Sequence, residues 1–167
     1  GGSLGARALN EIVPQALALI AAAQRPVVTH QSGASQIDAL RANYEAAGVQ
    51  ADCTPFIEDT ATAFADADII VCRAGASTVT EIAAVGAAAI FVPFPSAVDD
   101  HQTTNAQFLV DAGGGWLVQQ RDLTPEGLSQ MLLKLERPAL VDIALKAKNM
   151  QKINATREVV TACEELA

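Results

Sequence analysis

Short runs of apolar and β-branched residues alternate along the chain with longer segments that have helical spacing. The short runs lie at 27–30, 69–72, 89–92 and 116–118, and we expect them to be strands buried on both faces. Helical spacing is clearest in the first long segment, at Leu9, Ile12, Val13, Ala16, Leu17 and Ile20. Strands that alternate with helices predict an α/β fold with a parallel sheet.

Prolines and helix-capping residues refine the predicted helices. Pro14 falls inside the first helical segment and predicts a kink or a short opening helix, because proline has no amide donor. Thr124 offers an N-cap and is followed by Pro125 and an early carboxylate, so a helix should begin there and run to about Leu135. The segment 142–167 has no strand signal and predicts two further helices.

Composition favours one domain, 1–167, and excludes several kinds of partner. With 11 Lys and Arg against 19 Asp and Glu, the net charge of −8 would repel nucleic acid. The longest uncharged runs are interrupted by glycine and proline, so we expect no direct membrane insertion. The 3 cysteines are odd in number and have no CxxC spacing, which argues against disulfides and a zinc site and favours the cytoplasm.

A glycine-rich turn at 1–6 leads into the first helical segment. Backbone amides in such a turn, together with the helix dipole, suit a phosphate group. A tight strand-to-helix turn with no ligand explains the glycines equally well. A dinucleotide site is disfavoured, because the G-x-G-x-x-G spacing is absent and the next strand ends in Thr29, His30 and Gln31 without an acidic residue.

Small residues at 72–81 form a second strand-to-helix turn, and we expect its helix to begin near Thr78. Its amides could bind a second part of the same anion. Thr78 and Glu81 also have the spacing of a capping box, which would explain both residues without a ligand. If a nucleotide diphosphate lay there, Glu81 would be close enough to accept hydrogen bonds from a ribose diol.

A third polar segment follows Pro93-Phe94-Pro95 and contains Asp100, His101, Gln102 and Asn105. Such side chains suit sugar hydroxyls. In the alternative interpretation Asp100 is an acid that compensates the helix dipole, and His101 and Gln102 are solvated residues of the first helical turn.

Together these motifs resemble the MurG family in order and spacing over essentially the whole chain. The residues that carry the resemblance are Gly1 to Arg7, His30 to Gly33, Phe56-Ile57, Cys72 to Ala76, Glu81 to Ala83, Asp100 to Gln102, and Asn105-Ala106. The resemblance implies the C-terminal, donor-binding half of a GT-B glycosyltransferase: a Rossmann-like parallel sheet with helices on both faces. It also implies that the N-terminal acceptor domain is absent, together with a first strand before Gly1.

The resemblance assigns roles to individual residues. Ser3, Gly5 and the amides of Gly75, Ala76, Ser77 and Thr78 would face the donor pyrophosphate. Phe56 and Ile57 would contact uracil, Glu81 the ribose, and His101 and Gln102 the N-acetylglucosamine. Arg73 and Asn105 are further candidates, and Arg73 could instead be structural.

The implied reaction is inverting transfer of N-acetylglucosamine from UDP-N-acetylglucosamine to lipid I, forming lipid II for peptidoglycan. The catalytic base would belong to the N-terminal domain, so we expect this chain to bind the donor without catalysing transfer. No cofactor is implied, and because no Asp-x-Asp motif lies in a suitable loop, no metal is expected. The full-length protein would be peripheral on the cytoplasmic face of the inner membrane.

Two alternatives remain open from the sequence. One is a UDP-N-acetylglucosamine 2-epimerase-like domain, which uses the same donor and a similar fold. The other is the donor-binding subunit of a split glycosyltransferase. Because the chain begins inside the glycine motif, an excised part of a longer protein is favoured over a complete subunit.

Overall fold

A computed structural model describes residues 7–95 and 100–166. Its elements, in chain order, are α1 (Arg7–Ala18), η1 (Ala22–Gln24), β1 (Thr29–Gln31), η2 (Ala34–Gln36), α2 (Ile37–Ala46), β2 (Asp52–Thr54), α3 (Thr60–Asp66), β3 (Ile70–Cys72), α4 (Ala76–Val85), β4 (Ala89–Phe91), α5 (His101–Val110), β5 (Trp116–Leu117), η4 (Gln120–Asp122), α6 (Pro125–Lys134), α7 (Arg137–Asn149) and α8 (Ala155–Glu165).

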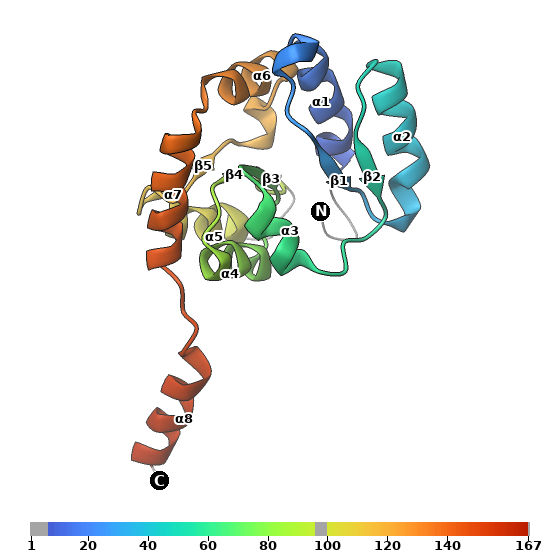
Figure 1. Ribbon diagram of the computed structural model, residues 1–167. Helices are drawn as coiled ribbons and strands as arrows, with labels where there is room; N and C mark the ends of the chain where they lie inside the picture. The colour runs from blue at the N-terminus through green and yellow to red at the C-terminus, as the bar shows by residue number, and fades with distance from the viewer. Residues whose placement is uncertain (1–6, 96–99, 167) are drawn as a thin grey trace.

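The strands are parallel, as the alternation of strands and helices predicts, but the described strands form two groups. β1 pairs with β2, and β3, β4 and β5 pair in that order. Helices α1, α2 and α6 lie on one side of the strands, and α3, α4 and α5 lie on the other (Figure 1). The carboxyl ends of β3 and β4 therefore meet at one edge, where α4 and α5 begin.

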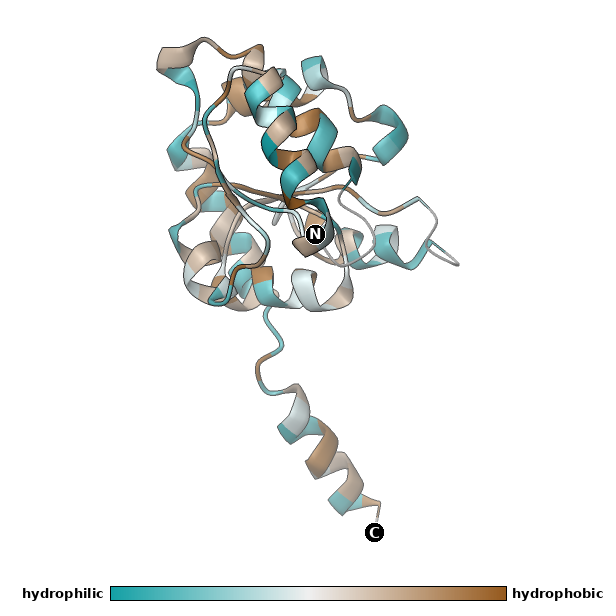
Figure 2. Cartoon of the chain, turned by 90° about the vertical axis from the view of Figure 1, so that its right-hand side faces the viewer, coloured by the Kyte–Doolittle hydropathy of each residue, from teal (hydrophilic) through white to brown (hydrophobic). Residues whose placement is uncertain are grey.

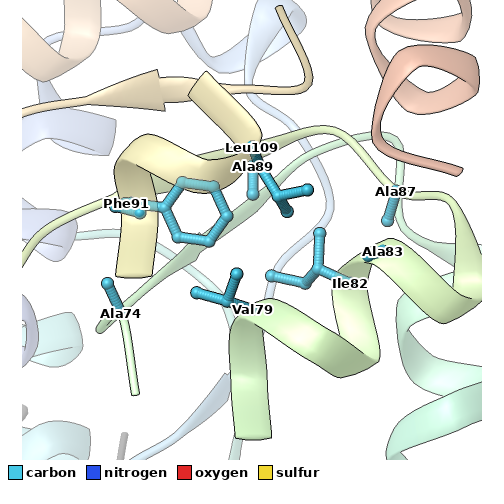
Figure 3. Packing of buried hydrophobic residues seen from close by; sticks show 9 residues of the cluster. Ala74, Val79, Ile82, Ala83, Ala87, Ala89, Phe91 and Leu109 are labelled. Carbon is cyan, nitrogen blue, oxygen red and sulfur yellow. The ribbon is translucent and has the colours of Figure 1, made fainter. Parts of the chain in front are cut away.

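The central strand β4 divides the core into two clusters. Successive side chains of a strand point to opposite faces. Ala89 and Phe91 accordingly pack with α4 and α5, as Figure 3 shows, whereas Ile90 and Val92 pack with α1 and α6. This strand is fully buried, which confirms the expectation for one of the predicted strands.

The other predicted strands are less buried than expected. β1, β3 and β5 are partly exposed, and Val27, placed in the first predicted strand, is fully exposed outside β1. The polar strand β2 was not predicted at all. An apolar run does not reveal whether a strand is central or at an edge, because that depends on which neighbours pair with it.

Helix α1 is continuous for 12 residues through Pro14, so the predicted short opening helix is wrong. Proline cannot donate to the carbonyl of Asn10, four residues earlier. The side chain of Asn43 donates to that carbonyl instead, with Nδ2 to O at 2.9 Å. A side chain of α2 thus replaces the hydrogen bond that Pro14 removes.

The C-terminal helices agree with the sequence in number but not in all their bounds. Thr124 caps α6 as predicted, its side chain accepting from the amide of Gly127 at 3.0 Å. α7 begins at Arg137, earlier than expected. It packs against α4, where Lys148 Nζ donates to the Ala84 carbonyl near the C-terminal end of α4.

Helix α8 extends away from the other elements in both whole-chain views (Figures 1 and 2). None of its residues is buried. Val159 and Val160 in the helix, and Ile153 just before it, expose half or more of their surface. None of the helices in the described ranges has the length and apolar character to cross a membrane.

Candidate functional site

Helix α4 begins directly after the exit of β3. Gly75 is its N-cap, and Ala76 is its first residue, so the start is earlier than the predicted Thr78. Thr78 and Glu81 both lie inside the helix, and no side chain caps it; the alternative interpretation of these residues as a capping box is therefore wrong. The first amides of a helix have no partner within the helix. The amides of Ala76 to Thr78 therefore form the partially positive end of the helix dipole, beside the edge of the sheet.

Two side chains of α5 hold the backbone just before this helix. Gln102 Oε1 accepts from the amide of Ala74 at 3.3 Å and from the amide of Phe94 at 3.0 Å. Asn105 Nδ2 donates to the Ala74 carbonyl at 3.1 Å. Two of the candidates from the third motif thus contact the chain at the start of α4, and these hydrogen bonds go to backbone groups of the protein.

Arg73 lies beneath the same edge and is only 7% exposed. Its Nη1 donates to the carbonyls of Val92 and Pro93, each at 3.1 Å, and its Nη2 donates to Gln120 Oε1 at 2.7 Å. The guanidinium also lies 5.4 Å from the centroid of the Phe94 ring. Burial lowers the pKa of Arg73. These contacts agree with the structural alternative for Arg73.

The candidate ribose and sugar residues are accessible. Glu81 is exposed on α4, just over one turn after Ala76, and His101 is exposed as the first residue of α5. Before His101, Asp100 has a left-handed backbone with φ of 50°, and its Oδ1 accepts from Thr103 Oγ1 at 2.6 Å. The two candidates therefore belong to adjacent helices that begin at the same edge.

The candidate uracil segment follows β2, which belongs to the two-stranded group with β1. Phe56 is 66% exposed and Ile57 is partly buried. The carbonyl of Phe56 accepts from Thr54 Oγ1 at 2.8 Å, which fixes the turn after the strand. Ser3 and Gly5, predicted for the first glycine turn, lie outside the described residues.

A partly buried polar network around His30 was not predicted. Its Nδ1 lies 3.0 Å from the Tyr44 hydroxyl and its Nε2 lies 3.0 Å from Asn10 Oδ1, while Asn10 Nδ2 donates to Gln36 Oε1 at 2.8 Å. Burial lowers the pKa of His30 to about 4, so the ring is neutral at pH 7. The sequence pattern marks His30 only as part of a motif, because its partners come from distant segments.

The cysteines offer no reactive centre at this edge. Cys53, Cys72 and Cys163 are unpaired thiols. Cys72, at the end of β3, packs against the α4 and α5 core, and burial raises its pKa to about 12. Its thiol is therefore protonated at neutral pH and acts as a core residue.

Comparison with known proteins identifies the family. A model described as the glycosyltransferase family 28 C-terminal domain matches residues 1–163. The chain is 79% identical over 166 residues to the UDP-N-acetylglucosamine--N-acetylmuramyl-(pentapeptide) pyrophosphoryl-undecaprenol N-acetylglucosamine transferase of Paracidovorax citrulli, covering 99% of this chain and 47% of that protein. It is 77% identical over 167 residues to the protein of the same name from Polaromonas naphthalenivorans, covering 100% of this chain and 46% of the relative.

Solved structures give the same result. The crystal structure of Acinetobacter baumannii MurG matches with a TM-score of 0.90 and 47% identity, over 99% of this chain and 50% of that chain. Glycosyltransferase VinC, solved in complex with dTDP, matches with a TM-score of 0.64 and 20% identity over 95% of this chain and 38% of its own, a likeness of fold alone.

The predicted Rossmann-like half of a GT-B glycosyltransferase is thereby confirmed. The chain spans about half the length of the curated relatives that it matches. It belongs to the family of glycosyltransferase family 28 C-terminal domains.

Proposed function

We propose that the chain binds UDP-N-acetylglucosamine as a glycosyl donor. In the full-length protein, the bound sugar is transferred with inversion to lipid I, giving lipid II for peptidoglycan. The proposal depends on the N-terminus of α4 at the exit of β3, where no side chain caps the helix amides. The relatives of the chain are named as N-acetylglucosamine transferases.

The amides of Ala76 to Thr78 suit the donor diphosphate because they combine unpaired donors with the positive end of the helix dipole. Developing negative charge on the departing UDP would be stabilised by the same groups. Gly75 supports this role. Its φ is −62°, and an added Cβ would meet only Thr78 Oγ1, at 3.9 Å. Neither backbone strain nor packing requires glycine there, whereas a ligand bound close to this backbone would favour a residue without a side chain.

We assign the remaining donor contacts to the residues that the resemblance to the family singles out. Glu81 accepts hydrogen bonds from the ribose hydroxyls, while Phe56 and the backbone of Ile57 contact uracil. His101 and Gln102 face the sugar, and Ser3 and Gly5 belong to the first phosphate turn. The exposure of Glu81, His101 and Phe56 is consistent with direct contact to a ligand.

The rest of the reaction belongs to a segment outside this chain. We infer an N-terminal acceptor domain that supplies the catalytic base, binds lipid I and meets the cytoplasmic face of the membrane. We also infer a parallel strand before Gly1 that lies between β1 and β3. In support, β1 and β3 each pair on one side only among the described strands.

Calorimetric titration tests donor binding. UDP-N-acetylglucosamine should bind, whereas NAD and UDP-N-acetylgalactosamine should bind more weakly or not at all. Glu81→Ala should weaken binding about 10-fold, because two hydroxyl donors lose a charged acceptor. Glu158→Ala, on the exposed helix α8, is the matched control and should bind as the parent does.

Equal affinity of Glu81→Ala and the parent would remove Glu81 from the site. Incubation of the full-length protein with donor and a lipid I analogue then distinguishes transfer from isomerisation of the donor. Isomerisation without transfer would overturn the proposed reaction in favour of an epimerase-like activity.

A further inference from the structure

Helix α5 holds both backbone groups of Ala74. Gln102 accepts its amide at 3.3 Å, and Asn105 donates to its carbonyl at 3.1 Å. Residues three apart on a helix share a face, so one surface of α5 makes both hydrogen bonds. Ala74 is fully buried, and the next residue, Gly75, is the N-cap of α4. The backbone conformation at the entrance to α4 is therefore constrained by side chains of a different helix.

The same carboxamide joins two strand exits. Gln102 Oε1 also accepts the amide of Phe94, just beyond β4, at 3.0 Å. Below it, Arg73 donates to the carbonyls of Val92 and Pro93. The exits of β3 and β4 are thus joined by two side chains, and the turn before α4 cannot shift without breaking these hydrogen bonds.

We propose that Gln102 and Asn105 are positioning residues for the diphosphate. By holding Ala74, they set the direction in which the amides of Ala76 to Thr78 point. Hydrogen bonds weaken steeply as the donor angle departs from linear, so a small rotation of this turn reduces the binding of an anion. The inference rests on the proposed donor-binding function and extends it to residues that act through the backbone.

This role differs measurably from direct contact with the sugar. The Gln102 oxygen already accepts two backbone amides, and the Asn105 amide group already donates to a backbone carbonyl. If the two residues act through the α4 turn, their loss affects every ligand that has a diphosphate. If they act only on the sugar, a nucleotide without the sugar is unaffected.

The test uses Gln102→Met and Asn105→Leu in the full-length protein that carries this chain. Both substitutions keep approximate size and remove the hydrogen bonds to Ala74. Affinities for uridine, UDP and UDP-N-acetylglucosamine are compared with those of Gln107→Met, a control at an exposed position of α5. We expect each variant to bind UDP about 5- to 10-fold more weakly, with uridine unchanged. UDP-N-acetylglucosamine should lose at least as much, and any additional loss in Gln102→Met measures the sugar contact proposed for that residue.

The double variant should be little weaker than either single variant, because both substitutions release the same residue, Ala74, through its amide and its carbonyl. Loss confined to UDP-N-acetylglucosamine would overturn the proposal in favour of direct sugar contacts. Equal loss for uridine would overturn it in favour of general structural damage.

A second measurement separates this proposal from the proposed function. Amide hydrogen exchange at Ala74 and Phe94 should accelerate in Gln102→Met even without ligand. Unchanged exchange would overturn the proposal that Gln102 holds these two backbone amides. If the parent itself fails to bind UDP while exchange accelerates as expected, the proposed donor binding is wrong. The hydrogen bonds from Gln102 and Asn105 to the backbone then have a structural role alone.

Discussion

Two polar networks brace the two groups of strands, and they differ in charge and in the groups they join. The His30 network, formed by Asn10, His30, Gln36, Asn43 and Tyr44, links mainly neutral side chains of α1, β1, η2 and α2. The Arg73 network, formed by Arg73, Gln102, Asn105 and Gln120, directs a buried cation and carboxamides mainly at backbone groups.

The difference indicates that the first network fixes how helices pack and the second fixes the path of the backbone. Side chains that bind one another fix how helices pack on a strand, which the His30 network does. Side chains that bind backbone groups fix the path of the chain, which the Arg73 network does at the exits of β3 and β4. The second arrangement lies where the proposed ligand needs accurately directed amides, because anion binding depends on their geometry.

The largest expected effect on the free energy of unfolding comes from removing the guanidinium of Arg73. Arg73→Met should lower the free energy of unfolding by about 3 kcal/mol, because the carbonyls of Val92 and Pro93 lose their donor in a buried place. Urea denaturation measures it. Arg121→Met, at a side chain that is 85% exposed, is the control and should change stability little. Equal stability of the two variants would show that the cation contributes nothing to the brace.

Acid should weaken the His30 network selectively. Burial holds the pKa of His30 at about 4 when folded, against an ordinary 6.5, so only the unfolded chain takes up this proton between those values. Stability from this residue is complete above about pH 6.5, declines as pH falls towards 4, and then levels off; the total is about 3 kcal/mol.

Thermal or urea unfolding between pH 4 and 7 measures this slope against His30→Gln. The variant cannot protonate there, so the difference between the two stability profiles should shrink with acid. Parallel profiles would contradict a neutral, buried imidazole.

The smallest expected effect concerns one hydroxyl. Tyr44→Phe removes the partner of His30 Nδ1 and keeps the ring, which lies edge-on to the imidazole at 5.7 Å. We expect a loss of about 1 kcal/mol, the usual net contribution of a neutral hydrogen bond. Denaturant midpoints of parent and variant measure it. A loss as large as that of Arg73→Met would erase the proposed difference between the two networks.

Much of the fold could be predicted from local patterns. The N-cap at Thr124 and the buried strand at 89–91 depend on neighbouring residues, and both agree with the structure. The polar strand β2 could not be predicted, because its pairing with β1 is a contact between segments 20 or more residues apart. Helix α1 passes through Pro14 because Asn43, distant in sequence, supplies the missing donor.

For the candidate site, the sequence singled out the segments at the starts of α4 and α5 but not what their side chains do. Gln102 was expected to contact the sugar, and Asn105 was a further candidate without an assigned role. The structure shows both side chains hydrogen-bonded to the backbone of Ala74. The direct ligand contacts, those of Glu81 and His101 included, stay predictions.

The order of residues by itself determined the α/β class, the parallel strands and the family, because strand length, helical spacing and motif spacing are local or one-dimensional properties. Only the tertiary structure decided where Arg73, Gln102 and His30 direct their polar groups. A hydrogen bond depends on distance and angle between atoms that the chain brings together, and neither can be calculated from separation along the sequence.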